Sequence, residues 1–245
     1  MSVTITLATV ARVLTQIRHD KRTVVVLLSV PSALLVLLRY IFGDRVDIFD
    51  QIGLTLLGIF PFISMFLITS VAMLRERTSG TLERLLSTPT HKADLLFGYG
   101  IAFALLAAVQ ATVAAAVAYG LLGLQSQGSF GMVIIIAITT AVLGSSTGLL
   151  TSAFARTEFQ ALQFAPAVIL PQLLLCGLIW PREQMAWPLQ AASDLLPLRY
   201  AADAMTEVGT FPTPTTTMLR DLLILIVFTI ALLLAATATL RRRAA

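Results

Sequence analysis

The chain has 245 residues, of which 57% are hydrophobic and 12% are charged, with a formal net charge of +4 and a mean hydropathy of +0.88. A soluble domain carries roughly 25% charged residues, so this composition excludes a water-soluble globular protein. It indicates an all-α polytopic membrane protein, because a helix of about 20 apolar residues crosses the ~30 Å hydrocarbon core of a bilayer.

The first segment, residues 3–20, carries apolar residues at helical spacing. Val3, Val10 and Leu14 belong to this stripe, and Arg12 lies outside it. The pattern predicts an amphipathic helix that lies at the inner surface of the membrane. An N-terminal helix packed on the rest of the bundle is the alternative interpretation.

Six apolar stretches follow, and we interpret residues 1–245 as a single transmembrane domain. The predicted spans are 23–42, 52–74, 95–122, 131–154, 160–180 and 219–240. If the N-terminus is inside, the inner segments contain twelve basic and five acidic residues, and the outer segments contain five and eight. Because Lys and Arg in short loops resist translocation, this bias predicts six spans with both termini in the cytoplasm.

A charged segment separates the second and third spans. Residues 74–96, "LRERTSGTLERLLSTPTHKADLL", hold seven of the thirty charged residues of the chain. Gly80 permits a sharp turn, and Thr88–Pro89 resembles an N-cap followed by the first position of the next helix. Three leucines share one face of a short helix: Leu82, Leu85 and Leu86. We therefore predict a helical cytoplasmic loop over residues 75–92.

The later spans contain polar but uncharged residues. Gly144 and Gly148 form a G-x-x-x-G pattern that lets another helix approach closely, either within this chain or from a second one. Pro166 and Pro171 are expected to kink the fifth span. Polar side chains in the spans either form hydrogen bonds between helices or line a substrate pathway; the candidates for lining are Gln110, Thr139, Thr140, Ser145, Gln163 and Gln172.

The outer segment, residues 181–217, is too polar to span a membrane, although about half of it is apolar. Pro181, Pro188 and Pro197 divide it into pieces about two helical turns long. This pattern favours short re-entrant helices that enter the outer leaflet, where such backbone must be buried in protein or line a wet cavity. A folded extracellular loop is the alternative.

Several kinds of chemistry have no signature in the chain. No Asp, Glu, Lys or His lies near the centre of a predicted span, which disfavours proton-coupled transport. The chain lacks G-x-x-x-x-G-K-[ST] and H-E-x-x-H, so we predict no nucleotide site, no catalytic residue and no metal site of its own. Cys176 is the single cysteine and cannot form an intrachain disulfide. We also expect no nucleic-acid partner.

Two motifs carry a resemblance to a known family. "RERTSGTLERLLSTP", residues 75–89, resembles the signature that follows the second span in permease subunits of ABC-2 type exporters. "LLPLRYAADAM", residues 195–205, resembles their Pro-Leu-x-Tyr element before the last span, although Thr206 stands where many members have a basic residue or Gln. The resemblance covers essentially the whole chain and is close to the daunorubicin-resistance branch.

The resemblance implies a division of labour between subunits. The permease would form the pathway as a homodimer or heterodimer in a bacterial cytoplasmic membrane, and two cytoplasmic ABC ATPase subunits would bind ATP and Mg²⁺. The cargo would be hydrophobic or amphipathic, such as a drug-like metabolite or a lipid, as in multidrug resistance. A stand-alone integral-membrane lipid-modifying enzyme, a passive channel and an accessory subunit remain as alternatives.

The resemblance also implies roles for particular residues. The loop after the second span would be a coupling helix that docks on the ATPase, and the N-terminal amphipathic helix would lie against the same subunit. The coupling residues would be Arg75, Glu76, Arg77, Gly80, Thr81, Leu82, Glu83, Arg84, Leu85, Leu86 and Pro89. The re-entrant helices would help to form an outer gate that contains Pro197, Leu198 and Tyr200.

Overall fold

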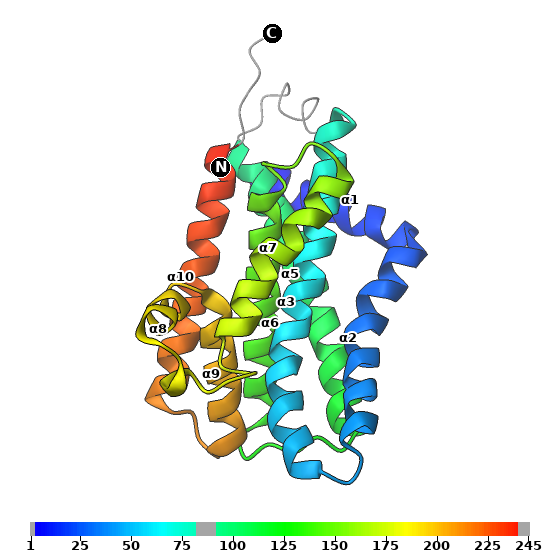
Figure 1. The fold of residues 1–245 in the computed structure, drawn as a ribbon. Helices are drawn as coiled ribbons and strands as arrows, with labels where there is room; N and C mark the ends of the chain where they lie inside the picture. The colour runs from blue at the N-terminus through cyan, green and yellow to red at the C-terminus, as the bar shows by residue number, and fades with distance from the viewer. Residues whose placement is uncertain (1–2, 82–91, 240–245) are drawn as a thin grey trace.

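The computed structural model is a bundle of long helices that stand side by side, with one further helix lying across one end (Figure 1). It describes residues 3–81 and 92–239, and within these ranges every regular element is a helix. The elements are α1 (Val3–His19), α2 (Lys21–Phe42), α3 (Val46–Thr78), α5 (Lys92–Gly120), α6 (Phe130–Thr151), α7 (Glu158–Leu175), the 3₁₀ turn η1 (Arg182–Gln184), α8 (Trp187–Asp194), α9 (Pro197–Thr210) and α10 (Thr216–Thr239).

Five helices among the described residues are long and apolar enough to cross a membrane: α2, α3, residues 97–120 of α5, α6 and α10. The fifth predicted span, 160–180, corresponds to α7, which has 18 residues and is not among these five. Gly177 lies just beyond its end with a φ of +94°, a conformation that stops helices and favours glycine. The prediction of an all-helical polytopic membrane protein is thus confirmed, and the count of six spans is not.

Helix α3 is longer than the predicted span of 52–74. It runs from Val46 to Thr78, a length of about 50 Å at 1.5 Å per residue. Asp47 lies in its first turn and Arg75 and Arg77 in its last, where they complement the helix dipole. These three charged residues lie outside the predicted span and belong to helical turns beyond its apolar core.

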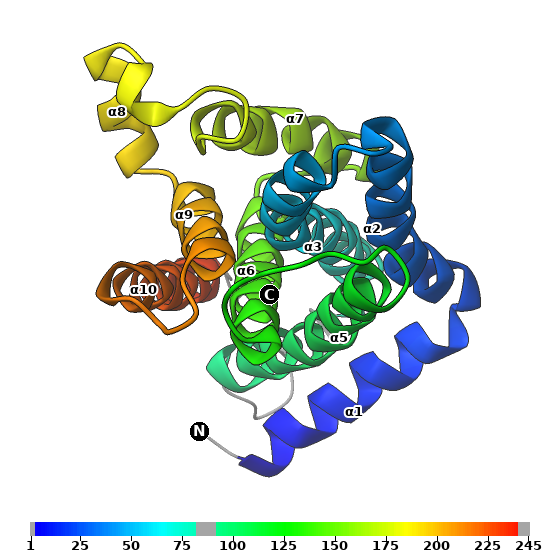
Figure 2. The same ribbon diagram turned by 90° about the horizontal axis from the view of Figure 1, so that it is seen from below.

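Helices α3 and α6 form the centre of the bundle, and the other long helices surround them (Figure 2). In α3 and α6, 67% of the most apolar window is buried, against 17% in α2 and α10. The two helices touch at the predicted G-x-x-x-G pattern. A methyl group added to Gly148 would lie 2.6 Å from the carbonyl oxygen of Phe66, and one added to Gly144 would strike the carbonyl of Phe62. The glycines thus serve close packing within the chain.

The prolines of the outer segment act as predicted, with one exception. Pro181 precedes η1, Pro188 lies in the first turn of α8, and Pro197 begins α9. Helix α8 has eight residues, as expected for two turns, but α9 has fourteen and is longer than predicted. No proline interrupts α9, because the next one after Pro197 is Pro212.

Helix α9 runs beside α10 and reaches its middle. The ring centroid of Tyr200, near the start of α9, lies 6.3 Å from that of Phe228, the thirteenth residue of the 24-residue α10. The far end of α9 lies near the start of α10, where Thr215 donates a hydrogen bond to Glu207. The outer segment therefore lies alongside the first half of α10, and its re-entrant character stays a prediction.

Candidate functional site

The predicted coupling residues begin at the end of the bundle that carries α1. Arg75, Glu76 and Arg77 lie in the last turn of α3, and Gly80, with a φ of +72°, turns the chain directly after it. The hydroxyl groups of Ser79 and Thr81 are 2.9 Å apart across this turn. The remaining coupling residues lie outside the described residues: Leu82, Glu83, Arg84, Leu85, Leu86 and Pro89.

Glu76 is occupied within the chain. Its carboxylate accepts two hydrogen bonds from Arg12 of α1, at 3.1 and 3.3 Å, and its side chain is only 7% exposed. Arg12 also donates a hydrogen bond to the hydroxyl of Tyr99 on α5, and its guanidinium lies 5.5 Å from the centre of that ring. This cluster, Arg12–Glu76–Tyr99, joins α1 to the two helices that flank the coupling segment. In this structure the Glu76 carboxylate contacts α1. Its expected contact with the ATPase stays a prediction.

A close crossing fixes α1 beside this cluster. Gly98 of α5 lies directly under Thr9 of α1, and a methyl group added to Gly98 would lie 2.6 Å from the β-carbon of Thr9. Val10 and Val13 are buried on the same side of α1, while Val3 and Leu7 remain exposed. Helix α1 is therefore packed on the bundle along one face, and it also presents apolar side chains outward, so the two interpretations of this segment are compatible.

Arg75 makes a second link at this end of the molecule. Its guanidinium forms a paired contact with both carboxylate oxygens of Glu158, at 2.8 and 3.0 Å. Both side chains are half exposed, so the pair contributes little to stability. It does connect the end of α3 to the start of α7, as Thr157 caps α7 and Glu158 occupies its first turn.

Four charged side chains form an ion-pair cluster in the outer segment. Arg182 of η1 pairs with Asp194 and Asp203 at 3.7 and 3.5 Å, and Arg199 pairs with the same two carboxylates. Arg199 also lies 4.7 Å from the centre of the Tyr200 ring. The outer cluster, Arg182–Asp194–Arg199–Asp203, holds η1, α8 and α9 together. We did not predict it, although Arg199 and Asp203 stand at the i,i+4 spacing of helical ion pairs.

Gln172 connects this outer segment to α7. It was predicted as a pathway residue, but its amide carbonyl accepts a hydrogen bond at 3.3 Å from the backbone N–H of Leu198, and its amide nitrogen donates to the carbonyl of Val168. Ser193 donates a second hydrogen bond, at 2.8 Å, to the carbonyl of Leu175. The first N–H groups of a helix have no acceptor within that helix. Gln172 supplies an acceptor for the N–H of Leu198, which follows Pro197 at the start of α9.

The other predicted pathway residues do not share one surface. Thr140 and Ser145 are buried, and each hydroxyl donates to a carbonyl one turn back in α6, as does that of Thr139. Gln110 is fully buried, with no hydrogen-bond partner for its amide among the described residues. Gln163 is exposed. None of them lines the three cavities described in this chain, so the pathway role stays a prediction.

Two cavities adjoin the outer segment. A polar cavity of about 450 Å³ lies at the end of the bundle opposite α1, between Asp47 and Asp50 of α3 and Thr206 of α9. A wider apolar groove of about 880 Å³ follows α7 from Pro166 to its end at Leu175, continues past Trp180 and reaches Leu189. No group of three or more His, Cys, Asp or Glu side chains among the described residues is arranged to hold a metal ion.

Removing Arg199 tests the outer cluster. In an Arg199→Leu variant, Asp194 and Asp203 keep only the longer contacts to Arg182, so we expect amide hydrogen exchange in α8 to rise about tenfold, the effect of roughly 1.4 kcal/mol. The control is Arg45→Leu, because the Arg45 side chain is exposed and forms no ion pair with the described residues. Equal exchange in both variants would mean that the cluster does not hold α8.

Comparisons with a protein family and with individual proteins all find transporters. The profile of the family described as ABC-2 type transporter matches residues 4–208. The chain is similar to the probable multidrug ABC transporter permease YbhR of Escherichia coli, at 26% identity over 154 residues, which are 63% of this chain and 42% of that protein. It is similar to ABC transporter G family member 20 of Dictyostelium discoideum, at 29% identity over 141 residues, which are 58% of this chain and 19% of that protein.

A third relative is the linearmycin resistance permease protein LnrN of Bacillus subtilis, at 24% identity over 137 residues, which are 56% of this chain and 35% of that protein. The matched part of the chain therefore spans less than half the length of each of these relatives.

Proposed function

The chain belongs to the ABC-2 type transporter family, and from that premise we propose that it is the permease subunit of an exporter driven by a separate ATPase. The ATPase subunits would bind ATP and Mg²⁺, and two permease chains would enclose the pathway. The observation that carries the proposal is the Arg12–Glu76–Tyr99 cluster. It ties α1 to α3 and α5, the two helices between which the coupling segment lies.

This arrangement suits the transmission of force. A push on the coupling segment would act on α3 and α5 together, and the cluster would carry α1 with them. Helix α3 is also the centre of the bundle and is packed against α6 through Gly144 and Gly148. Displacement of α3 would therefore move the bundle as a rigid body, which is a common form of switching between two packed states.

The cargo in this proposal is hydrophobic or amphipathic, a drug-like metabolite or a lipid, and it leaves the cell. The names of two relatives, a probable multidrug permease and a linearmycin resistance permease, support this class. The apolar groove along α7 offers a surface for such a compound. The membrane would be the bacterial cytoplasmic membrane, with the end that carries α1 in the cytoplasm, as the distribution of basic residues favours.

The first test compares ATP hydrolysis with and without the partner. The purified chain should hydrolyse no ATP, and the ATPase encoded beside it should form a complex whose hydrolysis rises when cargo is added. A Glu83→Ala, Leu86→Ala double variant should abolish that stimulation, because burying a leucine side chain is worth about 1.5–3 kcal/mol and the charge sets partner choice. Val46→Ala, at the other end of α3, should leave stimulation unchanged.

The outcomes separate the alternatives. Full stimulation in the Glu83→Ala, Leu86→Ala variant, with normal membrane insertion, would remove the coupling role. Turnover of lipid by the isolated chain would favour a membrane enzyme, and conductance of the isolated chain in a planar bilayer would favour a channel. Uptake rather than release in reconstituted vesicles of known orientation would reverse the direction.

A further inference from the structure

A third cavity of about 380 Å³ lies where α1 turns into α2, at the end of the bundle that carries the Arg12–Glu76–Tyr99 cluster. We call it the elbow cleft. Helix α3 forms its floor, and α7 adds one side chain. The residues that line it are Gln16, Ile17, Asp20, Arg22, Thr23, Val26, Leu67, Ile68, Val71, Ala72, Arg75 and Leu162.

The elbow cleft is amphipathic. Its interior is apolar, with side chains such as Leu67, Ile68 and Val71 from α3, and its charged residues come from the helix ends at its mouth. Three charged groups line it: Asp20, Arg22 and Arg75. Such a surface matches a ligand with a charged head and an aliphatic tail.

Two of the three charged groups that line the cleft already have hydrogen-bond or ion-pair partners within the chain. Asp20 caps α2, where its carboxylate accepts hydrogen bonds from the hydroxyl and the backbone N–H of Thr23, and these bonds lower the pKa of Asp20. Arg75 is held by Glu158. The side chain of Arg22 is exposed and makes no ion pair within residues 3–81 and 92–239. Arg22 is therefore the one cation in the lining of the cleft that has no ion-pair partner among the described residues, while Asp20 keeps its negative charge.

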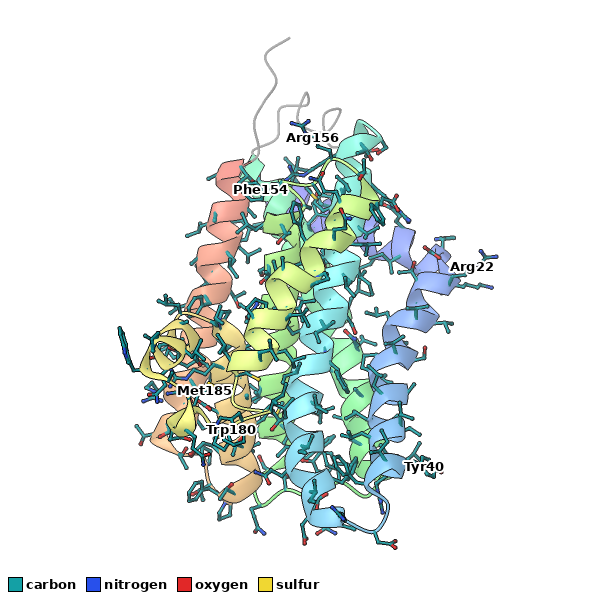
Figure 3. The ribbon with its side chains drawn as sticks, in the orientation of Figure 1. Arg22, Tyr40, Phe154, Arg156, Trp180 and Met185 are labelled. Carbon is teal, nitrogen blue, oxygen red and sulfur yellow. The ribbon has the colours of Figure 1, made fainter. Side chains whose placement is uncertain are left out.

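The surroundings of Arg22 indicate where the partner of that charge comes from. Arg22 lies at the outer edge of the bundle, and Figure 3 shows its side chain directed away from the neighbouring helices. Over the next two turns of α2, Val25, Val26 and Val30 are exposed, as expected of a face that meets acyl chains. Its neighbours in sequence are Arg18, His19, Asp20 and Lys21. With His19 neutral, residues 18–22 hold three positive charges and one negative charge, so the chain around the mouth of the cleft is basic overall.

We propose that the elbow cleft binds an anionic phospholipid from the leaflet on the α1 side, with the phosphate at Arg22 and one acyl chain against α3. Basic pockets between transmembrane helices on the cytoplasmic side select such lipids by charge. A bound lipid would fill the space between the α1–α2 turn, the end of α3 and the start of α7. It would thereby brace the elbow next to the Arg75–Glu158 pair. The proposal requires the chain to lie in a membrane but does not depend on an ATPase.

Native mass spectrometry of the full chain in detergent tests this inference. The protein is titrated with palmitoyl-oleoyl phosphatidylglycerol or, separately, with palmitoyl-oleoyl phosphatidylcholine. The wild type should retain the anionic lipid preferentially, and Arg22→Gln should lower its retention about fivefold, the effect of ~1 kcal/mol per basic residue near a membrane surface. The matched control, Lys21→Gln, removes the same charge from a neighbour that does not line the cleft and should change retention less than about twofold.

A second variant tests the cavity without changing any charge. Ala72→Leu fills the floor of the elbow cleft, and retention of phosphatidylglycerol should fall to the Arg22→Gln level while the elution profile and melting temperature show a folded protein. Equal losses in Arg22→Gln and Lys21→Gln would overturn the proposal in favour of diffuse attraction, as would equal retention of both lipids. Failure of cargo export with lipid retention intact would count against the proposed function alone.

Discussion

Replacing Gly144 with alanine should destabilise the chain severely, because the added methyl group meets the backbone of α3 at Phe62. A backbone carbonyl cannot move aside as a side chain can, so α3 and α6 would have to separate. Overpacking of this kind costs about 1–3 kcal/mol, and sometimes more. We expect about 3 kcal/mol here, since these two helices form the centre of the bundle.

The control lies in the same helix. Gly131 of α6 has no atom within 4 Å of an added methyl group, so Gly131→Ala tests the general effect of alanine on helix stability. That effect favours alanine by up to about 1 kcal/mol. The measurement is the free energy of unfolding in mixed detergent and the yield of monodisperse protein. Similar stabilities of Gly144→Ala and Gly131→Ala would show that the crossing of α3 and α6 tolerates a wider spacing.

The second large effect is expected when Glu76 becomes alanine. Arg12 would keep its hydrogen bond to Tyr99 but lose the charge that balances it. Breaking a buried ion pair from one side costs about 3–5 kcal/mol. Since the Arg12 side chain is 33% exposed, we expect the lower part of this range or slightly less. Helix α1 should become accessible to proteases and to hydrogen exchange.

Two comparisons make this result interpretable. Glu158→Ala breaks the half-exposed pair with Arg75 and should cost less than about 1 kcal/mol. An Arg12→Met, Glu76→Met double variant should recover most of the lost stability, because apolar replacement of a buried pair is often neutral. If the double variant is as unstable as Glu76→Ala, the effect comes from volume or packing rather than from an unbalanced charge.

The same variants have a functional readout. Substrate-stimulated ATP hydrolysis by the complex of the Glu76→Ala variant with its ATPase reports whether α1 must stay attached for coupling.

The sequence predicted the elements of the bundle well, because the spans depend on local properties. Apolar length predicted α2, α5, α6 and α10 to within a few residues, and helical periodicity predicted α1. Helix α3 extends beyond the predicted span of 52–74 at both ends, since an apolar window cannot distinguish the end of a helix from the end of its apolar core. Proline spacing predicted the breaks around η1 and α8 but not the length of α9, which depends on packing against α3, α6 and α10.

The contacts of the candidate site were much harder to predict. Arg12 and Glu76 are 64 positions apart, and Arg12 and Tyr99 are 87 apart, so no local pattern pairs them. In the sequence, Gln172 is one of several polar residues in a predicted span. Its hydrogen bond to the N-terminus of α9 joins residues 26 positions apart, so no local pattern predicts it. The family resemblance identified the segment around Glu76 and the Pro-Leu-x-Tyr element, but it did not predict that Glu76 is bound within the chain. The leucines of the coupling segment remain a prediction.

The meeting of α7 and α9 has a mechanical consequence. Helix α7 stops at Leu175, and α9 begins beside its last turns, so one wall of the bundle is assembled from two shorter pieces. One hydrogen bond, from Leu198 to Gln172, joins α9 to α7, and a second, from Ser193 to Leu175, joins α8 to the end of α7. Each contributes about 1 kcal/mol, far less than unwinding a continuous helix would require. The contact between α7 and the outer segment therefore depends on side-chain packing and these two hydrogen bonds, with no continuous helix across it.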